Sequence, residues 1–142
     1  MFTIDNTLDI SAPLARVLTA ITTEPGYRAW WAQDADFDGQ RATFRFSTPS
    51  ETRTVTLRVD RCDGNGIVMT CVAHENNPDW LGTTLAIDLA ETKSGTRVHL
   101  VHSGYPQKNE VYERCGEAWP YFLRSLAKYT MTGTGEPYPK AA

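Results

Sequence analysis

The sequence has no long hydrophobic run. A membrane-spanning helix needs roughly 20 predominantly apolar residues, and no segment of this chain approaches that length. The start, Met1 to Asp5, also lacks the basic stretch followed by an apolar one that is typical of a secretory leader. These absences predict a protein without a membrane span, and we expect it in the cytoplasm.

Basic side chains are too few to suggest a nucleic-acid surface. Lysine and arginine number 14 against 17 acidic residues, which gives a net charge of -3 and a pI near 5.6. The arginines of the central region occur singly and form no cluster interleaved with aromatic residues. We interpret them as the solvated face of a sheet, and no nucleic-acid partner is predicted.

Metal-ligand groupings and activated nucleophiles are also missing. The chain has three cysteines: Cys62, Cys71 and Cys115. Because their number is odd and they share no metal-ligand spacing, we expect reduced thiols. His99 and His102 point to opposite faces of one predicted strand, and no Gly-x-Ser-x-Gly motif occurs. The sequence therefore names no catalytic residue, no metal and no cofactor.

The chain does have enough apolar sequence for one core. Its 142 residues are 41% hydrophobic, which fits a single domain that we place at residues 1–133. A strand-like run at 95–104 leads into a long segment with an apolar stripe at spacings of three and four, which predicts a helix over Asn109 to Thr130. The stripe consists of Tyr112, Cys115, Trp119, Phe122, Leu123, Leu126 and Tyr129.

The ends of this helix carry recognisable signals. Asn109 is a suitable N-cap and Gly133 a suitable stop. Pro120 lacks a backbone donor and clashes with the preceding turn, so a bend or break is predicted between Gly116 and Pro120. Residues 134–142 are expected to be a flexible tail.

Upstream, the pattern predicts one strand, two short helices and then a meander. The first strand spans 2–10, a helix capped by Ser11 follows, and a second helix spans 27–32. Turn residues then separate five strand candidates at 37–46, 53–61, 67–74, 83–90 and 96–103. Alternation assigns an inward face to each of these strands except 67–74, where both faces are apolar.

The order of these elements resembles the helix-grip fold of the START-like superfamily, also called the birch-pollen-allergen-like or SRPBCC superfamily. Within it, four motifs resemble the family named for the activator of heat shock protein 90 ATPase. They are Ile10-Ser11-Ala12-Pro13, Trp30-Trp31, Gly95-Thr96-Arg97-Val98 with His102-Ser103-Gly104, and Gly116-Glu117-Ala118-Trp119-Pro120-Tyr121-Phe122-Leu123 with Leu126. The resemblance covers Thr3 to Gly133. It implies an α+β fold with a curved antiparallel six-stranded sheet, two short helices and a long C-terminal helix.

The segment after the tryptophan pair departs from the family pattern. Such proteins often carry a Gly-Gly pair there, whereas this chain has Asp36-Phe37-Asp38-Gly39-Gln40. The path into the second strand is therefore left open by the resemblance.

A curved sheet closed by one helix can enclose a cavity for a small ligand. The candidate lining is aromatic and aliphatic: Trp30, Phe44, Phe46, Val55, Leu57, Met69, Leu85, Leu100, Trp119, Phe122 and Leu123. The alternative is that these residues pack as an ordinary core, in which large aromatics are common. His102 shares the parity of Val98 and Leu100, so it is the polar candidate for contact with a ligand. We favour the alternative that it is a hydrogen-bonded histidine pinning the strand end.

The leading hypothesis is a binding module for a small apolar, aromatic or lipid-like ligand, because apolar lining is abundant and no catalytic set is recognised. The second is an enzyme of the cyclase or hydrolase kind in which His102 exchanges protons with Glu117 or Tyr121.

The third hypothesis is interaction with a chaperone. It would require an exposed apolar patch around Trp31, Trp80 and Trp119. A sheet edge could also pair across a homodimer.

Overall fold

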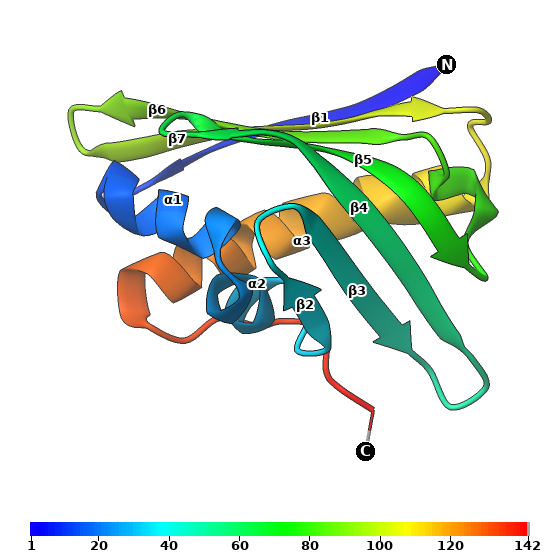
Figure 1. The fold of residues 1–142 in the computed structure, drawn as a ribbon. Helices are drawn as coiled ribbons and strands as arrows, with labels where there is room; N and C mark the ends of the chain where they lie inside the picture. Colours follow the sequence, from blue (N-terminus) through cyan, green and yellow to red (C-terminus); the bar gives the residue numbers. More distant parts are fainter. Residues whose placement is uncertain (142) are drawn as a thin grey trace.

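One antiparallel sheet curves around a long helix in the computed structural model, which describes residues 1–141 (Figure 1). Within these residues the sheet has seven strands in the order β1-β7-β6-β5-β4-β3-β2, and three α-helices lie on its concave side. The strands are β1 (Phe2–Ile10), β2 (Ala35–Phe37), β3 (Arg41–Ser47), β4 (Thr52–Asp63), β5 (Gly66–Glu75), β6 (Thr84–Thr92) and β7 (Gly95–Tyr105). The helices are α1 (Leu14–Thr22), α2 (Glu24–Trp30), the 3-10 turn η1 (Pro78–Trp80) and α3 (Glu110–Thr132). The predicted α+β helix-grip fold is confirmed.

The predicted count of six strands is wrong because the expected strand at 37–46 is a hairpin. Asp38 Oδ1 accepts hydrogen bonds from the backbone N–H groups of Gln40 and Arg41, each at 2.8 Å. Gly39 adopts a φ of 92°, which glycine tolerates best. The chain therefore reverses between β2 and β3, and Ala35 pairs with Phe44. This turn occupies the segment that departs from the family pattern.

The inward faces of the strands follow the predicted alternation. Phe44, Val55, Leu57, Leu85 and Leu100 are at most 1% exposed. In β5 the structure resolves the ambiguous parity: the buried side chains are Ile67, Met69 and Cys71. The core therefore lies between the concave face of the sheet and the three helices.

The short helices begin at other residues than the sequence suggested. Ser11 does not cap α1, whose N-cap is Pro13 and which starts without a side-chain cap. The helix α2 begins at Glu24, not at Tyr27, because Thr23 Oγ1 accepts the N–H of Gly26 at 3.2 Å. The two helices lie against each other, and the indole of Trp30 donates to the carbonyl of Ala20 at 2.8 Å.

The long helix α3 has the predicted caps and no break. Asn109 Oδ1 accepts the N–H of Tyr112 at 3.2 Å, and Gly133 ends the helix in the left-handed region with φ 89°. Pro120 lies inside the continuous helix, so the helix does not break between Gly116 and Pro120. Trp119 on one side of it and Leu123 on the other are both 2% exposed, so packing against the sheet holds the two halves together. No helix of residues 1–141 is both long and apolar enough to cross a membrane.

The segment after Gly133 packs back onto the domain through backbone hydrogen bonds. The N–H of Tyr138 donates to the carbonyl of Trp31 at 2.7 Å, and its carbonyl accepts the N–H of Gln33 at 2.9 Å. Ser125 Oγ accepts the N–H of Glu136 at 2.7 Å. The residues joined by these hydrogen bonds are distant in sequence, so no local sequence pattern could predict the contacts.

Candidate ligand-binding pocket

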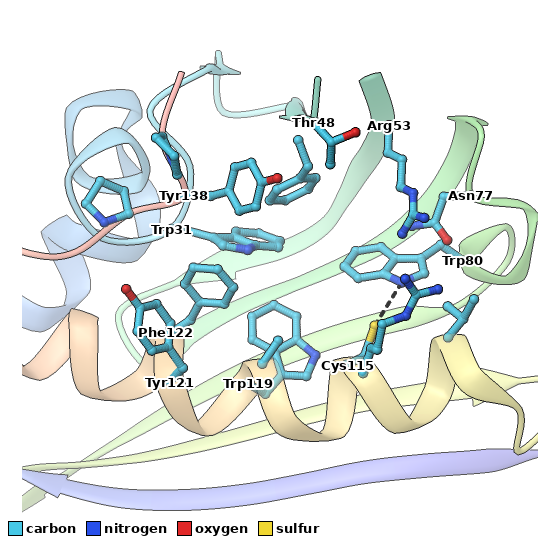
Figure 2. A pocket seen from close by; sticks show the side chains of 16 residues that line it. Trp31, Thr48, Arg53, Asn77, Trp80, Cys115, Trp119, Tyr121, Phe122 and Tyr138 are labelled. Carbon is cyan, nitrogen blue, oxygen red and sulfur yellow. Dashed lines mark hydrogen bonds between the residues drawn. The ribbon is translucent and has the colours of Figure 1, made fainter. Parts of the chain in front are cut away.

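A pocket of about 590 Å³ opens between α3, the ends of β3 and β4, the loop around η1 and the segment 137–139 (Figure 2). Seven of its sixteen lining residues are aromatic. The lining consists of Trp31, Phe46, Thr48, Arg53, Asn77, Trp80, Val111, Arg114, Cys115, Ala118, Trp119, Tyr121, Phe122, Pro137, Tyr138 and Pro139. The volume falls within the range of roughly 300–1,000 Å³ that small-molecule sites usually occupy.

Three nearly buried indoles line the pocket. The ring centroids of Trp31 and Trp119 are 5.0 Å apart, and Trp80 lies 6.5 Å from Trp31 and 6.4 Å from Trp119. They are 1%, 2% and 6% exposed for Trp31, Trp119 and Trp80, respectively. Such a cluster offers flat apolar surfaces on which another ring can stack.

The helix α3 has two adjacent stripes of side chains, one of which packs in the core while the other lines the pocket. Trp119, Leu123 and Leu126 are buried in the core. Arg114, Ala118 and Phe122 recur every four residues and line the pocket, as do their neighbours on the same side of the helix. Trp119 belongs to both sets, so this indole is the boundary between core and pocket.

The opposite wall comes from the strand end and the returning segment. The ring of Tyr138 meets Phe46 edge to face at 5.3 Å, and its hydroxyl donates to the carbonyl of Ser47 at 3.1 Å. Tyr121 on α3 donates to the carbonyl of Glu136 at 3.2 Å. The segment is therefore fixed at both sides of the pocket.

His102 lies beneath the indoles, outside the pocket lining, in a fully satisfied hydrogen-bond network. Thr83 Oγ1 donates to the carbonyl of Trp80 at 2.6 Å, so it accepts from His102 Nε2 at 2.9 Å. His102 Nδ1 then accepts from the hydroxyl of Tyr105 at 2.9 Å and from the indole of Trp119 at 3.1 Å. These bonds fix the neutral Nε2–H tautomer.

Burial has a strong effect on both polar rings of this network. Desolvation lowers the pKa of His102 from 6.5 to about 3. It also raises the pKa of Tyr105 above its ordinary value. Neither group exchanges protons near neutral pH, and the favoured interpretation of His102 as a satisfied structural histidine fits this geometry.

The mouth of the pocket carries its charged and sulfur-bearing groups. Arg53 comes from β4 and Arg114 from α3, and Asn77 lies beside Arg53 and Trp80 (Figure 2). Cys115 Sγ accepts the indole N–H of Trp80 at 3.4 Å. Within residues 1–141, no group of three or more His, Cys, Asp or Glu side chains is arranged to hold a metal ion.

The structure brings only part of the predicted lining to this pocket. Phe46, Trp119 and Phe122 line it. The others lie in the core and not in the lining: Trp30, Phe44, Val55, Leu57, Met69, Leu85, Leu100, His102 and Leu123. The physical reason is that buried side chains of α1 and α2, such as Ile21, Tyr27 and Trp30, pack against the inward side chains of the sheet and fill the space between them.

Several lining residues escaped the sequence prediction. Tyr138 lies in the segment taken for a loose tail, and Arg53 was interpreted as part of a solvated sheet face. Arg114 was not among the residues predicted to line a cavity. A usable signal was the second α3 stripe at 111, 114–115, 118 and 121–122, offset by about one residue from the core stripe.

Known structures share this architecture. The Aha1 dimer from Colwellia psychrerythraea is 23% identical, with a TM-score of 0.80 over 95% of this chain and 100% of that one. A protein from Staphylococcus saprophyticus is 18% identical, with a TM-score of 0.72 over 99% and 98% of the two chains. An AHSA1-like protein from Aeromonas hydrophila is 14% identical, with a TM-score of 0.71 over 93% and 94%.

These structural likenesses establish the fold. Among curated protein sequences, no significant match to this chain was found. The family model described as "Activator of Hsp90 ATPase homolog 1-like protein" matches residues 11–131, which include the tryptophan pair and nearly all of α3. With that match, the chain belongs to the family of activator of Hsp90 ATPase homolog 1-like proteins.

Proposed function

We propose that this protein is a binding module for a small, largely apolar molecule held in the pocket under α3. The supporting observation is the pocket itself, in which Trp31, Trp80 and Trp119 meet Phe46 and Phe122. A planar ligand stacked on these rings would leave water and bury apolar area on both partners.

The enzymatic alternative finds less support in the geometry. His102 lies outside the pocket lining, and its pKa of about 3 keeps it neutral. The hydroxyl of Tyr121 donates a hydrogen bond to the backbone carbonyl of Glu136. A cyclase or hydrolase would need a proton-exchanging group in contact with substrate, and these residues do not supply one.

The chaperone alternative requires an exposed apolar patch. The three indoles named for it are at most 6% exposed, so they form the interior of a pocket instead of a flat surface. The likeness to a protein studied as a dimer keeps a homodimer as a prediction for this chain.

Binding is tested with N-phenyl-1-naphthylamine, a neutral fluorescent probe whose emission rises in apolar sites. We expect saturable emission enhancement and an unfolding midpoint that rises with probe concentration. The native mass spectrum of the purified protein reports any co-purifying molecule and the predicted homodimer in the same measurement.

The location of the binding site is tested with a substitution that fills the pocket with a larger side chain. Ala118→Phe projects a ring into the pocket from α3 and is expected to weaken probe binding about tenfold or more, since it occupies ligand volume. The matched control is Ala15→Phe on the exposed side of α1, which should bind like the wild type. Equal binding by both variants would show that the probe binds elsewhere.

Cysteine modification gives a second readout. Cys115 lines the pocket and Cys62 is exposed on the sheet. Bound probe should slow the alkylation of Cys115 by iodoacetamide and leave Cys62 unchanged. Protection of neither thiol, together with absent emission, would refute the proposed function.

A further inference from the structure

The pocket is electrostatically asymmetric. Among its sixteen lining residues are two arginines, Arg53 and Arg114, and no aspartate or glutamate. Figure 2 shows Arg53 beside Asn77 and Trp80 at one end, while Trp31, Tyr138 and Phe122 gather at the other. Hydrogen-bond donors and positive charge are thus concentrated at one end of an otherwise apolar site.

Arg53 has a guanidinium edge left over for a ligand. Its Nε and Nη2 both approach Glu51 Oε1 at 3.1 Å, so Nη1 takes no part in this ion pair. The pair also fixes the guanidinium, whose side chain is 34% exposed, and reduces the entropy that a bound anion must overcome.

Arg114 faces the same end from α3. It is exposed, and within residues 1–141 it makes no ion pair. Asn77 adds an amide from the loop before η1. Because Arg53 is paired with Glu51, Arg114 is the lining cation without an ion pair in the described residues, and it lies next to an apolar wall that screens an anion from water on one side.

We infer that the ligand carries a carboxylate at one end of a flat apolar body, with the carboxylate at Arg53 and Arg114 and the body against the indoles. This inference rests on the proposed function. Along α3, residues 114 and 122 are separated by about 12 Å at 1.5 Å per residue, a length that fits a fused two-ring system plus its carboxylate. Arginine suits this role because its planar fork matches the two carboxylate oxygens.

The test compares two ligands of nearly equal shape, naphthalene-2-carboxylate and naphthalene-2-carboxamide, by isothermal titration at pH 7.5 and low salt. We expect the carboxylate to bind about tenfold tighter, because charge-assisted hydrogen bonds are roughly twice as strong as neutral ones. The preference should shrink at 0.5 M salt, whereas carboxamide affinity should change little.

Variants locate the source of the preference. Arg53→Gln combined with Arg114→Gln should remove the preference, so that the two ligands bind with equal affinity. Arg124→Gln is the matched control, since this arginine is exposed on α3 outside the pocket lining. It removes one positive charge outside the pocket and should keep the preference.

Each outcome separates the inference from the proposed function. Equal binding of the two ligands by the wild type, or a preference that survives in the double variant, would overturn the inference and leave the binding module intact. Binding of neither ligand, nor of the neutral probe, would overturn the proposed function and the inference with it.

Discussion

The network around His102 and the pocket above it are both rich in aromatic rings, and they share Trp80 and Trp119. In the network every ring nitrogen and hydroxyl of His102, Tyr105 and Thr83 has a partner. In the pocket, Arg114 faces solvent without an ion pair within residues 1–141. The contrast teaches that polar groups which satisfy one another stabilise a fold, whereas polar groups held at an apolar opening are available for recognition.

The largest expected effect comes from breaking the network. His102→Ala leaves the hydroxyl of Tyr105 and the indole N–H of Trp119 buried without their acceptor and creates a cavity. We expect the free energy of unfolding to fall by about 3–5 kcal/mol in urea titrations.

The matched control is His99→Ala. His99 lies on the other face of β7, where its side chain is 45% exposed and pairs with Asp5, so its loss should cost about 0.5 kcal/mol or less. Comparable losses in the two variants would mean that the network contributes no more than a surface pair.

The second effect is a pH dependence confined to the network. The folded-state pKa of His102 is about 3, below its ordinary value of 6.5, so the unfolded chain binds more protons between these values. The contribution of neutral His102 to the free energy of unfolding is therefore fully present above pH 6.5 and decreases as the pH falls below that value. We expect a contribution of about 1.5–2 kcal/mol to be lost between pH 6.5 and 5.

Comparison with His102→Gln isolates this contribution, because the other two histidines are present in both proteins. The wild type should show the steeper loss. Direct observation of the imidazole by NMR is the second measurement: a His102 resonance that titrates near pH 6.5 in the folded protein would contradict the prediction.

A smaller effect is expected at the wall of the pocket. Tyr138→Ala removes the contact with Phe46 and the hydrogen bond to Ser47, so we expect a loss of about 1 kcal/mol and weaker binding of the neutral probe. Tyr138→Phe keeps the ring and should retain probe binding. Unchanged binding in the alanine variant would show that the returning segment is not part of the site.

The smallest effect on stability is expected at the mouth. Arg114→Gln should change the unfolding free energy by less than about 0.5 kcal/mol, because the side chain is exposed and unpaired within the described residues. A loss of 2 kcal/mol or more would remove the contrast between network and pocket, since Arg114 would then be structural.

Local periodicity in the sequence correctly predicted which residues of α3 and of the strands face the core. The α3 stripe and the alternation of Val98, Leu100 and His102 follow from burial, which repeats with the geometry of helix and strand. Periodicity does not tell whether a buried face meets protein or ligand, so Leu57 and Leu85 were assigned to a cavity that the core fills.

Other features depend on contacts that no short window contains. The split between β2 and β3 depends on one carboxylate, Asp38, and the position of Tyr138 depends on backbone bonds to Trp31 and Gln33. Phe46, near the far end of β3, and Tyr138 both line the pocket, so its location could not be predicted before the fold was known.

Because core and pocket use different stripes of α3, the helix can accept substitutions on its pocket side without losing its packing against the sheet. Substitutions at 114, 118 and 122 alter the pocket, while 123 and 126 keep the helix on the sheet. Single substitutions at these positions can therefore change the shape and charge of the pocket without compensating mutations in the interior. Trp119 is the exception, because a substitution there changes both the buried hydrogen-bond network and the pocket lining.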